Sequence, residues 1–304
     1  MSTSTFRFTD PDGFQIFTYK WAPDSGQPKA AVQLVHGMAE HALRYERFAK
    51  FLNQVGYVVY ADDHRGHGKT AGDLSKAGIG GMESFEGMVT DEKQLTGLIK
   101  QENPGLPLFL FGHSMGSFIG QTYIERWAGE LKGVVLSGTT GLAILMRKAL
   151  PVMEQAAAGD LRDQFPQGPG IFAAMNAAFA PVKTPFDWLS RDEVEVQKYF
   201  DDPWCGFAFS NGMMLDMARG VVDMLQPENQ AHIPKDLPVL MIAGELDPVG
   251  ANDGVRSLAQ RYTSLGIHDM QVILYPQARH EVLNETNRDQ VQQDVLAWLE
   301  AHLK

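Results

Sequence analysis

The sequence has one cysteine, fewer basic than acidic residues, and no long apolar run. With Cys205 as the only cysteine, no internal disulfide can form, which is typical of a protein from a reducing compartment. The 26 basic and 37 acidic residues give a net charge of −11, which argues against nucleic acid and against capture by an anionic membrane surface. No uncharged apolar run approaches the ~20 residues of a membrane-spanning helix. Met1 to Asp12 is polar and lacks the basic region followed by an apolar region that a signal peptide has. We expect a soluble, cytoplasmic protein without a nucleic-acid partner, its oligomeric state left open.

The usual patterns of a metal or cofactor site are also missing. No cysteine–histidine cluster has metal-ligand spacing, and no Gly-x-Gly-x-x-Gly follows the first strand. Lys69 and Thr70 follow a glycine-rich loop, but the rest of a phosphate-binding loop is absent. The sequence therefore predicts no metal and no cofactor, so that any chemistry must come from side chains.

Short apolar runs that alternate with amphipathic stretches fill both ends of the chain. We expect strands over Phe14–Trp21, Ala30–Val35, Tyr57–Tyr60, Leu106–Phe111, Gly133–Leu136, Pro238–Ala243 and Met270–Tyr275. We expect helices over about Arg44–Val55, Phe85–Gln101, Ser117–Trp127 and Asn287–Leu303. This alternation predicts an α/β fold with a mainly parallel central sheet covered by helices on both faces, and the first strand antiparallel.

The alternation stops between about Gly141 and His232. Helical patterns rich in alanine, methionine and phenylalanine replace the β-branched runs there, and seven of the 14 methionines fall in this stretch. Because the stretch lies between two strands of the sheet, we interpret it as an insertion. The predicted domains are a core of residues 1–140 and 233–304 and a helical cap, or lid, of residues 141–232.

Gly112-His113-Ser114-Met115-Gly116 stands between an expected buried strand and an expected helix. This context predicts a sharp strand-to-helix turn that holds the Ser114 hydroxyl above the carboxyl edge of the sheet. The glycines are needed because a side chain there would collide with a neighbouring strand or helix. The N–H of Met115 is then free to bind an oxyanion, which makes Ser114 a candidate nucleophile.

A nucleophilic serine needs a histidine as base and a carboxylate that orients the histidine. After such a turn they follow in the order acid, then histidine, each just beyond a later strand. His280 lies in the loop that leaves the last expected strand, and Asp247 follows the strand before it. Pro248 favours an extended conformation at Asp247, so we prefer Asp247 to Glu245, which remains the alternative acid.

The second oxyanion donor is expected in the loop after strand Ala30–Val35. Gly37 allows a sharp turn there, and the N–H of Met38 is our candidate. We expect His36, His64 and His67 to have structural roles near this loop rather than to act as the base.

Together these residues resemble the α/β-hydrolase superfamily, and the finer pattern resembles its monoacylglycerol lipase and lysophospholipase branch. The likeness runs from about residue 10 to 300 and rests on His36-Gly-Met-Ala-Glu-His-x-x-Arg-Tyr45, Asp62-Asp-His-Arg-Gly-His-Gly68, Gly112-His-Ser-Met-Gly116, Gly244-x-x-Asp-Pro-Val-Gly250, Arg279-His280-Glu281 and the cap segment from Ser190 to Pro203. It implies Ser114, Asp247 and His280 as nucleophile, acid and base, with the Met38 and Met115 N–H groups as the oxyanion hole. It also implies a cap that covers an acyl-chain tunnel.

Four further residues are candidates for substrate binding. Glu40 and Arg44 lie just past the oxyanion loop and are either ordinary surface residues or ligands of a polar head such as glycerol. Met213 and Met217 are either core residues of the cap or adaptable side chains that line the acyl tunnel.

We therefore expect a serine hydrolase that cleaves carboxylic esters, of the monoacylglycerol or lysophospholipid type, through a covalent acyl-enzyme. The expected partner is a small-molecule acyl ester, with transient contact between the cap and a membrane or micelle. The alternatives are a short-chain carboxylesterase or peptidase-like hydrolase on the same scaffold, and a ligand-binding homologue without turnover.

Overall fold

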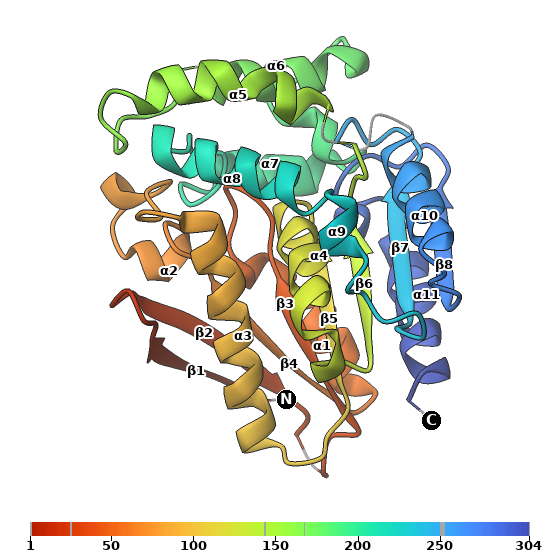
Figure 1. The fold of residues 1–304 in the computed structure, drawn as a ribbon. Helices are drawn as coiled ribbons and strands as arrows, with labels where there is room; N and C mark the ends of the chain where they lie inside the picture. Colours follow the sequence, from red (N-terminus) through yellow and green to blue (C-terminus); the bar gives the residue numbers. More distant parts are fainter. Residues whose placement is uncertain (1, 25, 143, 167, 250–252, 304) are drawn as a thin grey trace.

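One sheet of eight strands forms the centre of the structure, a computed structural model that describes residues 2–24, 26–142, 144–166, 168–249 and 253–303. The strand order is β1-β2-β4-β3-β5-β6-β7-β8 (Figure 1). The strands are β1 (Ser2–Thr9), β2 (Gln15–Ala22), β3 (Ala30–Val35), β4 (Tyr57–Asp63), β5 (Leu108–His113), β6 (Gly133–Ser137), β7 (Val239–Gly244) and β8 (Met270–Tyr275). The pairs β1–β2 and β2–β4 are antiparallel and all the others are parallel, which confirms the mainly parallel sheet.

Helices connect the strands and cover both faces of the sheet. The α-helices are α1 (Glu46–Gln54), α2 (Gly68–Ala71), α3 (Ser84–Glu102), α4 (Met115–Trp127), α5 (Ile144–Ala157), α6 (Gly168–Asn176), α7 (Glu193–Asp201), α8 (Asn211–Asp223), α9 (Pro227–Gln230), α10 (Gly254–Ser264) and α11 (Arg288–Ala301). The short 3₁₀-helices are η1 (Ala42–Tyr45), η2 (Leu74–Lys76), η3 (Ala128–Glu130), η4 (Ala177–Phe179), η5 (Asp187–Leu189) and η6 (Val282–Asn284).

Alternate side chains of the central strands enter two separate cores. Leu110 of β5 packs with α3, α4 and α10 on one face, whereas Phe109 and Phe111 pack with α1 and α11 on the other. Every residue of β5 is buried, which explains why this strand is an unbroken apolar run rather than an alternating one.

The register brings the carboxyl ends of five neighbouring strands to one edge of the sheet. Val35 of β3 pairs with Gly112 of β5, and His113 of β5 pairs with Ser137 of β6. The loops that follow β3, β5, β6, β7 and β8 therefore meet at this edge, where ligands of open α/β sheets bind.

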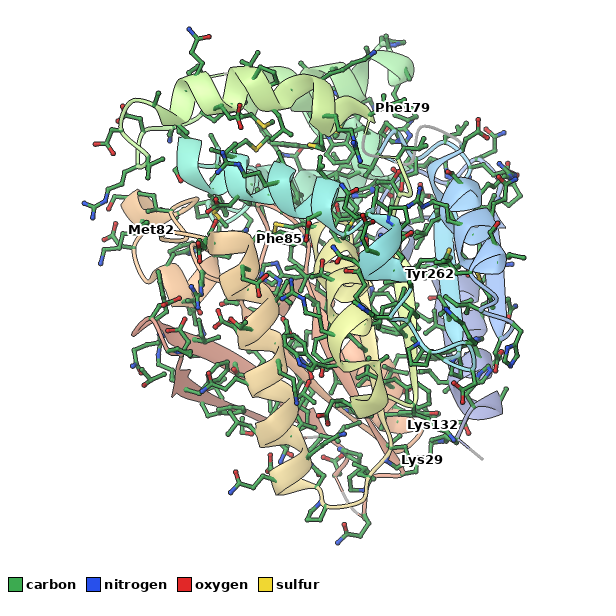
Figure 2. All side chains as sticks on the ribbon, in the orientation of Figure 1. Lys29, Met82, Phe85, Lys132, Phe179 and Tyr262 are labelled. Carbon is green, nitrogen blue, oxygen red and sulfur yellow. The ribbon has the colours of Figure 1, made fainter. Side chains whose placement is uncertain are left out.

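Between β6 and β7 the described residues form helices and no strand of the sheet. Helices α5 to α8 lie over the carboxyl edge (Figure 1). Phe85 of α3 marks the junction with α8, because its ring fills the space that a side chain at Gly220 would occupy (Figure 2). The division into a core and a cap at residues 141 and 232 remains a prediction.

Two strands differ most from those expected. We expected no strand over Ser2–Thr9, but this polar segment pairs along its whole length with β2. We placed the end of the third expected strand at Tyr60, whereas β4 continues to Asp63 because its last residues pair with β2.

None of the described helices combines the length and the apolar character that a membrane-spanning helix requires.

Candidate active site

Ser114 lies in a sharp turn between β5 and α4. Its backbone is in an unusual conformation, with φ +53° and ψ −120°. The turn is tight because the backbone passes close to its neighbours: a Cβ atom on Gly112 would lie 2.4 Å from the Gly116 carbonyl oxygen, and one on Gly116 would lie 2.1 Å from the Val35 carbonyl oxygen. Only glycine fits at either position, and the strained turn presents Ser114 at the carboxyl edge of the sheet.

His280 and Asp247 form a buried pair beside this turn. His280 Nδ1 lies 2.9 Å from both carboxylate oxygens of Asp247, and both side chains are almost fully buried. The side chain of Glu245, the alternative acid, is exposed. Since His280 lines the same cavity as Ser114, with Asp247 behind the ring, the structure brings the three predicted residues together.

The carboxylate decides the proton affinity of His280. Burial alone lowers the pKa of a histidine, but the charge of Asp247 and its hydrogen bond outweigh burial and raise the pKa of His280 above its ordinary value. His113, whose ring centroid lies 4.7 Å from that of His280, has no such partner. Burial and the charge of His280 lower the pKa of His113 to about 4, so this second histidine stays neutral.

Two backbone N–H groups near Ser114 make no hydrogen bond within the described part of the chain. They belong to Met38, after β3, and to Met115, the first residue of α4. A Cβ atom on Gly37 would lie 3.2 Å from Ser114 Cβ, so the Met38 loop touches the serine. These are the two donors that the sequence predicted, and they flank Ser114 as oxyanion donors must.

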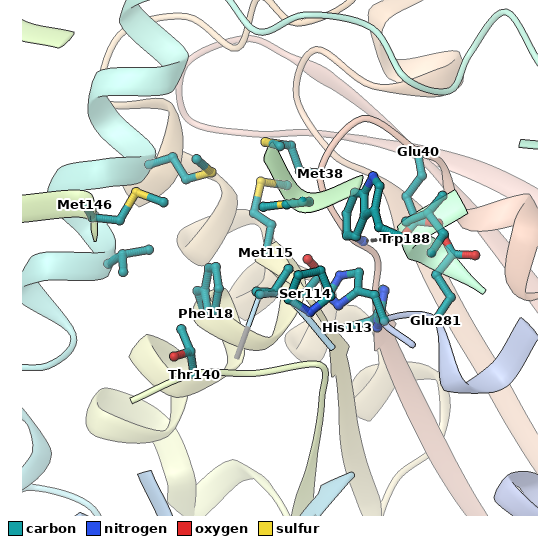
Figure 3. A pocket seen from close by; sticks show the side chains of 18 of the residues that line it. Met38, Glu40, His113, Ser114, Met115, Phe118, Thr140, Met146, Trp188 and Glu281 are labelled. Atoms are coloured by element: carbon teal, nitrogen blue, oxygen red, sulfur yellow. Dashed lines mark hydrogen bonds between the residues drawn. The ribbon is translucent and has the colours of Figure 1, made fainter. Parts of the chain in front are cut away.

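A largely apolar cavity opens above Ser114. Its walls come from the sheet edge and from helices between β6 and β7, including Met146 and Trp188. In Figure 3, Met146 and Phe118 lie on one side of Ser114, whereas Glu40 and Glu281 lie on the other. The cavity therefore has an apolar end and an acidic end.

Arg44 connects the acidic side chains behind the cavity. Its guanidinium forms a bidentate ion pair with Glu281, in which the two nitrogen–oxygen distances are 2.6 and 2.7 Å. It forms a second ion pair with Glu40. Burial opposes ionisation of Glu281, but the charge and hydrogen bonds of Arg44 lower the pKa of Glu281 to about 2. Glu40 and Glu281 line the cavity, whereas Arg44 holds them from behind.

The two methionines predicted to line the tunnel differ in position. Met217 lines the cavity together with Met214 and Val221, one turn apart along the same face of α8. Met213 lies about 100° from Met214 around the helix axis, and its thioether sulfur is 3.4 Å from the position that a Cβ atom on Gly80 would occupy. The structure therefore places Met213 in the buried packing of α8 and outside the cavity wall.

Sequence reasoning missed three residues of the site. Trp188 packs its ring 5.0 Å from that of His280, and the Tyr199 hydroxyl donates to the Ala39 carbonyl at 2.8 Å. Both come from the segment between β6 and β7. Tyr199 lies within the cap segment from Ser190 to Pro203 that resembles the family, but nothing in that segment marked it as a site residue. Glu281 follows His280 directly, and its position in that turn was the available signal.

Two groups of described side chains bring three atoms of metal-binding type within 4.8 Å of one another. They are His41, Asp202 and Cys205, and Asp62, His64 and Glu92. His41 Nε2 is hydrogen-bonded to Asp202 at 2.9 Å, and His64 Nδ1 to Asp62 at 3.1 Å. Each histidine is thus already hydrogen-bonded to a carboxylate, and we assign neither group as a metal site.

Comparison with known families and proteins agrees with this geometry. The model of the family described as serine aminopeptidase, S33, matches residues 26–287. The chain belongs to this α/β-hydrolase family. The match confirms the superfamily inferred from the sequence motifs.

Individual relatives of this hydrolase are lipases and esterases. A monoacylglycerol lipase from Mycolicibacterium smegmatis is 31% identical over 99% of this chain and 98% of its own length. A monoglyceride lipase from Homo sapiens is 28% identical over 90% of this chain and 82% of its own. The crystal structure of a thermostable carboxyl esterase from Bacillus coagulans in complex with glycerol has a TM-score of 0.92 and 30% identity, with full coverage of both chains. These findings support ester hydrolysis by this hydrolase and do not favour the alternatives.

Proposed function

We propose that this chain hydrolyses monoacylglycerols through a covalent acyl-enzyme on Ser114. The observation that carries the proposal is the buried His280–Asp247 pair beside Ser114 in one largely apolar cavity. Such an arrangement supplies a nucleophile, a base and a binding site for an acyl chain in one place.

In the proposed mechanism, His280 removes the proton of the Ser114 hydroxyl as its oxygen attacks the ester carbonyl. Asp247 holds the ring by Nδ1 and stabilises the imidazolium that forms. The N–H groups of Met38 and Met115 bind the oxyanion of the tetrahedral intermediate. His280 then protonates the departing alcohol, and a water molecule activated by the same histidine releases the fatty acid.

The two ends of the cavity fit the two parts of a monoacylglycerol. The methionine-lined end suits an alkyl chain, because thioether side chains adapt their shape at little cost. Glu40 and Glu281 at the other end accept hydrogen bonds, which suits the hydroxyl groups of glycerol. The same carboxylates repel a phosphate, so we favour a monoacylglycerol over a lysophospholipid.

We also propose that residues 141–232 act as a cap that contacts a membrane or micelle transiently. Ile144, Val194 and Phe200 support this proposal, since these apolar side chains are 61%, 65% and 49% exposed. The cytoplasmic location expected from the sequence remains part of the proposal.

The test is a comparison of head groups at one acyl length. We expect kcat/KM to be higher for monooleoylglycerol than for oleoyl lysophosphatidylcholine, with the p-nitrophenyl ester as a control for intrinsic activity. Equal or greater activity on the lysophospholipid would overturn the assignment of the head group. If the folded wild-type protein hydrolyses none of the three substrates, the proposed function itself is overturned.

A further inference from the structure

Three buried histidines lie beneath the loop that carries Met38, and the proposed mechanism does not use them. The rings of His36 and His64 stack with centroids 3.8 Å apart, and the His67 ring lies 5.1 Å from that of His36. All three side chains are 1% exposed or less. Their hydrogen-bond partners determine which ring nitrogens carry protons.

Each ring nitrogen of His64 lies within hydrogen-bond distance of an oxygen atom. Nδ1 lies 3.1 Å from a carboxylate oxygen of Asp62, and Nε2 lies 3.2 Å from the backbone carbonyl of His36. A neutral imidazole has one N–H donor, whereas an imidazolium has two. Burial opposes ionisation of Asp62, but the charge and hydrogen bond of His64 lower the pKa of Asp62, so Asp62 is a carboxylate. Both hydrogen bonds then form together only if His64 is an imidazolium.

The surrounding carboxyl groups balance this charge. One oxygen of Asp62 and one of Glu92 are buried without a hydrogen-bond partner in the described structure, and a proton on Glu92 would join the two groups. Burial and the charge of Asp62 raise the pKa of Glu92 well above its usual range, so Glu92 holds that proton. Burial lowers the pKa of His64, but the charge and hydrogen bond of Asp62 raise it further, and the net shift is upward.

His36 is in the opposite state. Its Nε2 accepts the backbone N–H of His64 at 3.1 Å, and its Nδ1 donates to the Gly37 carbonyl at 2.8 Å. Burial and the neighbouring charge of His64 hold the pKa of His36 well below its ordinary value. His36 is therefore neutral, with its proton on Nδ1.

These protons orient the peptide groups of the oxyanion loop. His64 binds the His36 carbonyl, and the Gly37 N–H donates to Glu40 at 2.6 Å, which fixes both sides of the first peptide. His36 holds the Gly37 carbonyl. Because a trans peptide points its C=O and N–H in opposite directions, the Met38 N–H turns away from the His36 ring. The next N–H, of Ala39, donates to His67 Nε2 at 3.3 Å.

We infer that His64 is a buried imidazolium and a positioning residue, which together with neutral His36 directs the Met38 N–H toward the oxyanion. The inference rests on the proposed function, in which Met38 is an oxyanion donor. His64 touches no substrate and acts through the peptide groups of the loop.

The protonation state is tested without any activity measurement. Nitrogen-15 NMR of the full-length protein labelled at histidine, at pH 8, should show His64 with both ring nitrogens protonated. The signal is assigned to His64 by its loss in His64→Gln or, should that variant not fold, by its shift in Glu92→Gln. A His64 ring with one unprotonated nitrogen, or with a metal ion bound to it, would overturn the inference.

The positioning role is tested with a transition-state analogue. A long-chain trifluoromethyl ketone forms an oxyanion on the serine, whereas an ether analogue of the substrate does not. We expect His64→Gln to lower kcat by about 10²- to 10³-fold, as loss of an oxyanion donor does, and to weaken ketone binding in parallel, with KM and ether binding nearly unchanged. Equal loss for both analogues, or an unchanged kcat in the folded variant, would refute the role.

Asn53→Ala is the matched control for loss of stability. Asn53 is a buried side chain that donates to the carbonyls of Trp21 and Tyr57, away from the loop. This variant should unfold at a lower temperature and keep the preference for the ketone. If the wild-type protein itself does not bind the ketone through Ser114, the proposed function fails, while the NMR result still decides the charge of His64.

Discussion

At the scale of single residues, two neighbouring histidines show how a carboxylate sets the pKa of a buried imidazole. His113 and His280 are both buried, and their rings are 4.7 Å apart. Only His280 is bonded to a carboxylate, that of Asp247, so only His280 holds a pKa above the ordinary value. Burial without this partner leaves His113 neutral, with a pKa of about 4.

This difference predicts a specific pH dependence. The base must be neutral, so kcat/KM should fall as the pH drops through the pKa of His280, which lies above the ordinary value of about 6.5. Asp247→Asn removes the interaction that raises the pKa of His280, and burial then dominates. We expect the acidic limb of the pH profile to move to lower pH and the maximum rate to fall by about 10⁴-fold, measured with p-nitrophenyl esters.

Glu245→Gln is the control for the same measurement. Glu245 is two residues from Asp247 but its side chain is exposed, so both the rate and the pH profile should stay near those of the wild type. A larger loss from Glu245→Gln than from Asp247→Asn would show that the acid is wrongly assigned.

Local motifs made part of the candidate site predictable, and three-dimensional contacts determined the rest. Ser114 and His280 each lie next to a strand that can be predicted from the local sequence pattern. Tyr199 reaches the site by bonding to Ala39, 160 positions away, and a contact at that separation leaves no local pattern. Met213 lies outside the cavity wall although Met214 lines it, because a difference of one residue on α8 changes the direction of a side chain by about 100°.

At the scale of elements, Arg44 joins the loop after β3 to the loop after β8. Its partners Glu40 and Glu281 are both buried, and they belong to the oxyanion loop and the His280 loop respectively. One guanidinium thus holds the two loops in a fixed position relative to each other.

Removing this cation should destabilise the protein strongly. Arg44→Met leaves two buried carboxylates without a counter-charge, and breaking a buried ion pair typically costs about 3–5 kcal/mol. Arg47→Met is the matched control, since Arg47 is 39% exposed and its pair with Glu195 should contribute only about 0–1 kcal/mol. Chemical denaturation of both variants measures the difference, and equal losses would contradict the role of Arg44.

Helix α8 should set the preferred acyl length. Each CH₂ buried in the apolar end contributes about 0.8 kcal/mol, so kcat/KM should rise about fourfold per CH₂ until the cavity is full. Met217→Trp narrows that end, and we expect it to shorten the preferred chain while activity on acetyl esters is kept. The measurement is kcat/KM for C2 to C16 monoesters.

Met213→Leu is the control on the same helix. Met213 packs outside the cavity wall, so a substitution of similar volume should leave the length profile unchanged. A flat profile in the wild-type protein, or acetyl as its best substrate, would contradict a long-chain lipase.

The sequence was sufficient to predict most elements but not all their ends. Strand β5 and helix α4 were predictable because an apolar run and a helical pattern flank the glycines of the turn. Strand β1 was not, because its side chains are mostly exposed and its stability comes from pairing with β2. The extension of β4 to Asp63 has the same cause, since pairing with β2 overrides the polar side chains at the end of that strand.

At the scale of the whole molecule, the sheet gathers groups that are far apart in the sequence. Met38, Ser114, Asp247 and His280 follow four different strands, and the parallel register brings their loops to one edge. The helices between β6 and β7 then enclose that edge and supply the apolar wall (Figure 1). Every step of the proposed mechanism requires that Ser114, at the edge of the sheet where these loops meet, is the nucleophile.

The most direct test is mass spectrometry of the protein after reaction with a long-chain fluorophosphonate. The mechanism predicts one adduct per chain, on the peptide that contains Ser114, with loss of ester hydrolysis in proportion to labelling. Ser114→Ala should keep the wild-type melting temperature, take up no label and lose activity by about 10⁴- to 10⁶-fold. Labelling of a different residue, or substantial hydrolysis by the folded Ser114→Ala variant, would contradict it.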